Sequence, residues 1–180
     1  MGELMDCADI YMDSNLLNGA IPTEFGKLSK LQSAAFDRNH LDGTLPSELG
    51  QASSLLYLTM HGNQMQGTLP SEFGLWDAVF VLDFGANNLN GTLAPEFVGW
   101  RGLEFLDLHG NKFTGSPRVL AELPLLRQLY IENTEFDNLD GLCDEPSDWD
   151  LFVANECFAD RYDCSCCTEC CIGTDFCMPL

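Results

Sequence analysis

The residues able to do chemistry fall into two groups, histidines with aspartates in the earlier part of the chain and cysteines near its end. His61 and His109 share their region with Asp37, Asp83 and Asp107, and imidazoles together with carboxylates can bind a metal ion or transfer protons. The cysteines from Cys143 onward can form disulfides or bind metal as thiolates. Which of these reactions is available depends on where the backbone places the side chains.

A repeat of 24 residues determines that placement. The segment LQSAAFDRNHLDGTLPSELGQASS recurs in register, and a fixed period of this length indicates a solenoid. Within each copy the fourth and sixth positions are apolar, an alternation with the period of a short strand. Stacked copies predict a parallel sheet with strands about 4.8 Å apart, apolar toward the core and polar on a concave surface. The repeats begin at Cys7, Leu31, Leu55, Val79, Leu103 and, in degenerate form, Leu126.

The pattern L-x-x-L-x-L-x-x-N-x-L-x-G-x-L-P-x-x-L-G resembles a leucine-rich repeat of the plant-like type over roughly residues 2–136. The resemblance implies a leucine-rich-repeat solenoid, a right-handed curved superhelix with a parallel β-sheet on its concave face and 3-10 or loop segments on its convex face. We divide the chain into repeats at 1–138 and a Cys-rich C-terminal cap at 139–180. The resemblance also implies that the asparagines at position nine form a buried ladder that satisfies backbone groups of adjacent turns. These are Asn15, Asn39, Asn63, Asn87 and Asn111.

The first repeat has no N-terminal cap, because residues 2–7 align with residues 26–31 and the chain begins in mid-repeat. Terminal repeats of a solenoid need a polar cap over the open end of the core. We therefore expect the C-terminal part of a longer protein, with any signal segment upstream. A short protein with a frayed first turn is the alternative. The uncapped N-terminal edge is also a candidate for association with a partner or a second copy.

The repeat register argues against a metal or catalytic centre. His61 and His109 fall two repeats apart, so their backbones are expected about 9.6 Å apart. A zinc ion about 2 Å from its ligand atoms would require both rings to turn inward across Gly85. No Ser-His-Asp or Cys-His arrangement is supported either. We predict no catalytic residues, no metal and no cofactor, with a pH-sensitive contact surface as a milder role for the histidines.

The cysteines predict a disulfide-rich cap in an oxidising compartment. They are Cys143, Cys157, Cys164, Cys166, Cys167, Cys170, Cys171 and Cys177. Eight cysteines allow 105 connectivities, so the pairing stays open. The run C-S-C-C-T-E-C is similar to the C-terminal cap of leucine-rich-repeat proteins of diatoms and related algae, which implies an extracellular or wall-facing module. Zinc binding by thiolates is the rival interpretation. Cys7 occupies a core leucine position and is expected to be a small buried hydrophobe.

The concave face carries the predicted partner-binding site. Aromatic and apolar side chains bordered by carboxylates have the pattern of an interface, in which anchors lie within a polar surround. The alternative is that these residues only shield the sheet from water. Asn90 opens an Asn-Gly-Thr sequon that is usable if the chain is secreted. The candidate partner-binding residues are Tyr11, Asp13, Asp37, Tyr57, His61, Val81, Asp83, Phe105, Asp107, His109, Tyr130 and Glu132.

The charge balance narrows the class of partner. The formal net charge is −20, from 28 acidic and 8 basic residues. This excess repels phosphate backbones and anionic headgroups, which excludes nucleic acid and acidic membranes and favours a basic protein or a glycan. No apolar run approaches the length of a membrane span. We expect a non-catalytic extracellular recognition module, either secreted or the ectodomain of a membrane-anchored protein. A structural or adhesive scaffold of a cell wall and an inhibitor of a wall-degrading hydrolase are the alternatives.

Overall fold

The structure, a computed structural model, describes residues 6–137, Leu139 and Leu142, and the backbone of three later strands. These strands are β13 (Leu151–Asn155), β14 (Glu169–Ile172) and β15 (Phe176–Pro179). The predicted disulfides and the rival thiolate site fall outside the described side chains, and both stay predictions. They concern Cys143, Cys157, Cys164, Cys166, Cys167, Cys170, Cys171 and Cys177.

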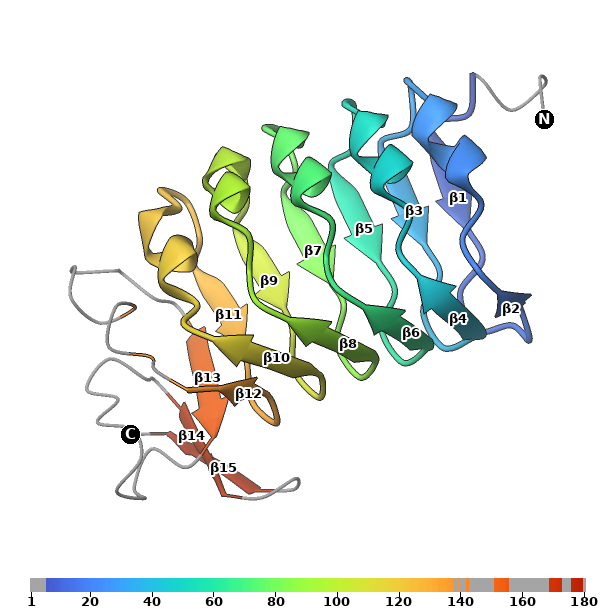
Figure 1. Cartoon of the computed structure of the whole chain (residues 1–180). Coiled ribbons are helices and arrows are strands. Elements are labelled where there is room, and N and C mark those ends of the chain that lie inside the picture. The colour runs from blue at the N-terminus through green and yellow to red at the C-terminus, as the bar shows by residue number, and fades with distance from the viewer. Residues whose placement is uncertain are drawn as a thin grey trace.

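The predicted strands form a single parallel sheet on the concave face of a curved solenoid (Figure 1). Each strand covers positions three to five of a repeat, and equal positions face each other, as Val81 faces Phe105. The alternation is as expected, because the middle residue of each strand is buried. The strands are β1 (Asp9–Tyr11), β3 (Ser33–Ala35), β5 (Tyr57–Thr59), β7 (Val81–Asp83), β9 (Phe105–Asp107) and β11 (Gln128–Tyr130).

The concave sheet continues past the last repeat. β13 pairs in parallel with β11, β14 pairs in parallel with β13, and β15 closes this end as an antiparallel neighbour of β14. Leu139 and Leu142 are also buried in the core. Part of the segment assigned to the cap therefore extends the sheet and the core of the repeats.

A second parallel sheet of six strands, which the sequence did not predict, lines another side of the solenoid (Figure 1). Its glycines at repeat position thirteen have φ between 75° and 83°, a conformation that residues with a Cβ rarely adopt. The strands are β2 (Asn18–Gly19), β4 (His40–Thr44), β6 (Gln64–Gly67), β8 (Asn88–Gly91), β10 (Lys112–Gly115) and β12 (Glu135–Phe136).

Short 3-10 helices form the convex side, as the resemblance implied. Prolines at the entry to the first three have extended backbone angles, with φ of −65°, −74° and −61°. Trp76 and Trp100 follow the third and fourth helices, are fully buried, and stack on Phe73 and Phe97 at 4.1 and 4.2 Å between ring centroids. The helices are η2 (Thr23–Lys27), η3 (Ser47–Gln51), η4 (Ser71–Leu75), η5 (Pro95–Gly99) and η6 (Arg118–Glu122).

The asparagine ladder connects consecutive repeats and confirms the structural interpretation of position nine. The amide of Asn87 donates to the carbonyls of Met60 at 2.9 Å and Phe84 at 3.1 Å, and its Oδ1 accepts the N–H of Met65 at 3.0 Å. Asn39, Asn63 and Asn111 are buried and make equivalent contacts. Asn15, in the first repeat, is exposed, and among the described residues its side chain bonds only to Met12 and Asp13 of its own repeat.

The first repeat exposes apolar side chains that later repeats bury. Met12 is 42% exposed, whereas Phe36 and Met60 at the same repeat position are 3% and 0% exposed. Cys7 packs against the core but is only partly buried, so the expectation of a buried thiol holds only in part. Among the residues described, no helix combines the length and apolar character that a membrane crossing requires.

Candidate ligand-binding surface

An acidic depression of about 360 Å³ lies on the concave side at the end of the strands. Its carboxylates come from the first, second, fourth and fifth repeats, which the solenoid brings together although they are 24 residues or more apart in sequence. Arg38 supplies the single basic side chain among its lining residues apart from histidine. The lining residues are Asp13, Ser14, Asp37, Arg38, His61, Asp83 and Asp107.

The backbone turns sharply at repeat position eight, where Ser14 and Arg38 belong to the lining of this depression. All six repeats have positive φ there, between 52° and 67°, including non-glycine residues such as Arg38 and Ala86. Gly62 and Gly110 suit this conformation, which residues with a Cβ rarely adopt.

Hydrogen bonds hold two of the carboxylates in place. Asp37 accepts the hydroxyl of Thr59 at Oδ2 and the backbone N–H of His61 at Oδ1, both at 2.7 Å. Asp83 accepts the backbone N–H of Gly85 at 2.9 Å, and the same oxygen lies 3.4 Å from Nδ1 of His61. The oxygens are therefore positioned before any ligand arrives.

Negative charge accumulates at this end of the strands. Burial raises the pKa of Asp83 to about 6, with further contributions from the charges of Asp107 and Asp37. Burial also raises the pKa of Glu132, and the hydrogen bond that the His109 ring donates to Asp107 raises the pKa of His109. Such shifts are expected where carboxylates cluster without enough counter-charge, and they mark the region as one that would gain from a bound cation.

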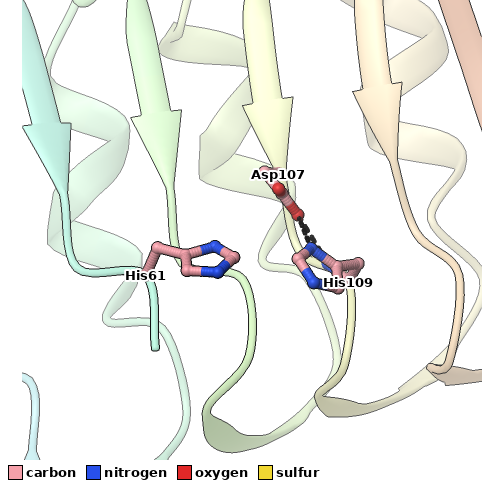
Figure 2. Close-up of side chains that lie close together, drawn as sticks. All are labelled: His61, Asp107 and His109. Atoms are coloured by element: carbon pink, nitrogen blue, oxygen red, sulfur yellow. Dashed lines mark hydrogen bonds and ion pairs between the residues drawn. The ribbon is translucent and has the colours of Figure 1, made fainter. Parts of the chain in front are cut away.

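The rings of His61 and His109 turn toward each other, as Figure 2 shows, with centroids 5.2 Å apart. The expectation that a spacing of two strands keeps them apart was wrong. Gly85, at the same position of the intervening repeat, has no side chain to separate them. A Cβ on Gly85 would lie 2.6 Å from Nδ1 of His109, so the ring occupies space that any other residue would fill.

Apolar side chains line two further depressions on the same face. Tyr57 packs against Phe80 at 5.8 Å between centroids, and Phe105 packs against Tyr130 at 5.5 Å. The larger depression, of about 410 Å³, is lined by Thr59, Phe80, Val81, Asp83, Glu104, Phe105, Arg127 and Gln128. The other, of about 300 Å³, is lined by Tyr11, Ser33, Ala34, Ala35, Tyr57 and Thr59. We call Tyr11, Tyr57, Phe80, Val81, Phe105 and Tyr130 the apolar strip.

Most candidate residues from the sequence therefore come together, in two groups: the apolar strip along the strands, and the carboxylates and histidines at their ends. Sequence reasoning missed Arg38, Phe80, Glu104 and Arg127. The available signal for Phe80 was a phenylalanine at position two, where the next two repeats have the charged residues Glu104 and Arg127. Asn90 is exposed on β8, and its glycosylation stays a prediction.

Four features together define a leucine-rich-repeat solenoid: the repeat period, the parallel concave sheet, the asparagine ladder and the convex 3-10 helices. The chain is a leucine-rich-repeat protein of the plant-like type: the family model described as Leucine Rich Repeat matches residues 102–123, and plant receptor ectodomains share the fold. No curated protein matches the chain.

Three solved structures illustrate the similarity. The ectodomain of the plant membrane receptor kinase GASSHO1/SCHENGEN3 from Arabidopsis thaliana, in complex with CASPARIAN STRIP INTEGRITY FACTOR 2, is 27% identical, with a TM-score of 0.75 over 78% of this chain and 17% of that chain. A TDR receptor is 33% identical, with a TM-score of 0.69 over 71% of this chain and 22% of that chain. The ectodomain of the receptor kinase SOBIR1 from Arabidopsis thaliana is 27% identical, with a TM-score of 0.65 over 71% of this chain and 70% of that chain. The chain thus spans about a fifth of the length of the first two receptors.

Proposed function

We propose that this chain is a non-catalytic recognition module that binds an extended segment of a partner protein across the concave sheet. The observation that carries the proposal is the continuity of the apolar strip with the acidic depression, since Asp83 lines both the depression of 410 Å³ and the acidic one. Apolar anchors next to a polar, hydrogen-bonded surround are the arrangement found at binding hot spots.

The similar receptors support a ligand of this kind. The ectodomain of the membrane receptor kinase GASSHO1/SCHENGEN3 is in complex with CASPARIAN STRIP INTEGRITY FACTOR 2, and SOBIR1 is also a receptor kinase. By analogy we place this chain outside the cell, where a disulfide-rich cap would also be stable. The analogy is one of fold, so the properties of this chain's own surface must define its ligand.

The charge of the surface defines the partner further. The acidic depression has four aspartates and only Arg38 and His61 as basic groups in its lining. A lysine or arginine side chain placed there would gain charge-assisted hydrogen bonds from oxygens that are already fixed. We therefore propose a partner segment with an aromatic or aliphatic residue on the apolar strip and a basic residue at the acidic depression.

The test is selection of binders from a random peptide library displayed against the full chain, followed by affinity measurements on variants. Tyr57→Ala and Phe105→Ala should each weaken the selected peptides by at least about tenfold, the loss typical of a hot-spot residue. Leu75→Ala is the matched control, because Leu75 is an equally apolar, exposed side chain on the convex helix η4.

Two results would contradict the proposal. One is that the selected peptides bind equally well to Tyr57→Ala, Phe105→Ala and the wild type. The other is that Leu75→Ala weakens binding as much as the concave variants do. Either result would favour a structural or adhesive scaffold protein that does not bind a partner through its concave face.

A further inference from the structure

We propose that His61, Asp107 and His109 form a site for one divalent transition-metal ion of the kind that prefers imidazole ligands, such as Zn²⁺. One ligand atom from each of the three residues lies within 4.8 Å of the other two. Figure 2 shows the two rings facing each other, with Asp107 beside His109. Two imidazoles and a carboxylate, with water in the remaining position, are a common ligand set for zinc sites that keep an open position.

The distance between the rings fits a shared ion. An imidazole nitrogen binds zinc at about 2.0–2.1 Å, which places each ring centroid about 3.2 Å from the ion. Two such rings at a tetrahedral angle have centroids about 5.2 Å apart. The centroids of His61 and His109 are 5.2 Å apart.

Gly85 provides the space for this arrangement. A Cβ at this residue would lie 2.6 Å from Nδ1 of His109 and 2.9 Å from Oδ1 of Asp107. The other five repeats all have a side chain at the equivalent position. The gap in this column therefore lies directly between the two histidines.

A carboxylate lies next to Nδ1 of each histidine. Oδ1 of Asp107 is 2.6 Å from Nδ1 of His109, and Oδ1 of Asp83 is 3.4 Å from Nδ1 of His61. Nδ1 of His109 and Oδ1 of Asp107 are close enough to bind one ion together once that nitrogen gives up its proton. Asp83 is not a ligand and accepts the proton of Nδ1 of His61, which leaves Nε2 of His61 as the metal ligand. Histidines that bind metals are commonly oriented by such carboxylates.

The surrounding charge favours a cation. Glu132 has a buried Oε2 that accepts no hydrogen bond within the described part of the chain, and its negative charge acts on His109. Asp83 and Asp107 contribute two further carboxylates at the same place. A divalent ion would compensate this excess, because a bound cation is the largest local charge in such a site.

The test is equilibrium dialysis of the full chain against Zn²⁺, with the bound metal quantified in the wild type and in variants. His61→Ala and His109→Ala should each bind one equivalent less than the wild type. His40→Ala is the matched control and should bind as much as the wild type, because His40 is exposed on β4 outside the site. Taking the difference between variants removes any zinc held by the cysteines of the cap.

The same zinc content in the wild type, His61→Ala and His109→Ala would overturn the proposal. Circular dichroism and the unfolding midpoint, both measured with EDTA, show whether each variant is folded. If His109→Ala does not fold, His61→Gln decides, since the His61 side chain is 34% exposed and its loss leaves the core intact. Binding of the selected peptides in EDTA distinguishes a failure of this site from a failure of the proposed function.

Gly85→Ala tests the geometry without removing a ligand. Gly85 is outside the left-handed region, so alanine is compatible with its backbone and acts only on its neighbours. The added methyl group must displace the His109 ring, and we expect zinc affinity to fall by at least tenfold. An unchanged affinity in Gly85→Ala would contradict a site built across this residue.

Discussion

Oδ1 of Asp107 lies 2.6 Å from Nδ1 of His109 and also accepts the backbone N–H of that histidine at 2.9 Å. Two contacts from one oxygen fix both the ring and the turn that carries it. The hydrogen bond raises the pKa of His109 above its usual 6.5. The stabilisation is therefore fully present below the unfolded pKa and is lost as the pH rises through the higher folded pKa.

Asp83 should make the metal-free protein more stable in mild acid. Its folded pKa of about 6 exceeds the unfolded value of 3.8, so the folded state holds more protons between these values. Stability is then highest below the unfolded pKa and falls as the pH rises through 6, by on the order of 2 kcal/mol. Asp83→Asn should remove this dependence and be more stable than the wild type at pH 8. Unfolding midpoints in EDTA at pH 5 and pH 8 measure the effect. The same change in unfolding midpoint between pH 5 and pH 8 in the wild type and in Asp83→Asn would contradict this prediction.

Loss of a ladder asparagine should destabilise the solenoid strongly. Asn87→Ala leaves the buried N–H of Met65 and the carbonyls of Met60 and Phe84 without this partner. We expect the free energy of unfolding to fall by about 3 kcal/mol in urea denaturation, since each unsatisfied buried group costs about 1–3 kcal/mol. Asn15→Ala is the control at the same repeat position and should change stability by less than about 0.5 kcal/mol, because Asn15 is exposed.

Replacing each of the two buried tryptophans by phenylalanine should lower the free energy of unfolding by different amounts, and the difference should equal the contribution of one hydrogen bond. Nε1 of Trp100 donates to the carbonyl of Phe73 at 2.8 Å, whereas Nε1 of Trp76 is buried with no partner in the described part of the chain. Both stack on a phenylalanine, so replacement by phenylalanine removes similar volume. Trp100→Phe should cost about 1–2 kcal/mol more than Trp76→Phe in equilibrium unfolding. A larger loss in Trp76→Phe would show that packing outweighs the hydrogen bond.

Asp37 should contribute to stability as well as to the acidic surface. Asp37→Ala deprives the hydroxyl of Thr59 and the backbone N–H of His61 of their acceptor. We expect a loss of about 1–2 kcal/mol in the free energy of unfolding, because these groups are only half-buried and water replaces the carboxylate in part. Asp13→Ala, at the exposed equivalent position of the first repeat, should have little effect. Equal changes in the free energy of unfolding in both variants would mean that the removal of a negative charge, and not the loss of the hydrogen bonds of Asp37, determines the change.

The repeat period was sufficient to predict the concave sheet and its register, and the resemblance to plant-like leucine-rich repeats implied the asparagine ladder. Each depends on a residue type that recurs every 24 positions, such as the buried Leu58, Leu82 and Leu106. Burial of Trp76 and Trp100 was also predictable from their matching positions. The second sheet was not, because its strands are short and carry Gly43 and Gly67 where strand residues are expected.

The convergence of His61 and His109 was missed because sequence spacing gives backbone distances and not side-chain directions. Two strands at about 4.8 Å predict about 9.6 Å, but an imidazole reaches several ångströms from its Cα. The His109 ring occupies space that a side chain at Gly85 would fill, and sequence spacing does not show this. The grouping of Phe80 with Val81 and Phe105 was missed for a similar reason, since position two borders the strand and was not counted with the face.

The in-register stacking of the concave strands repeats equivalent positions at a fixed spacing across this surface. Adjacent strands are about 4.8 Å apart, whereas an extended peptide lying across them advances about 3.3 Å per residue. The two spacings coincide after about three peptide residues and two repeats. Alternate peptide side chains point away from the surface, so the same contact recurs only after about six residues and four repeats. An extended peptide bound along the length of this solenoid would therefore make equivalent side-chain contacts only at regular, widely spaced positions.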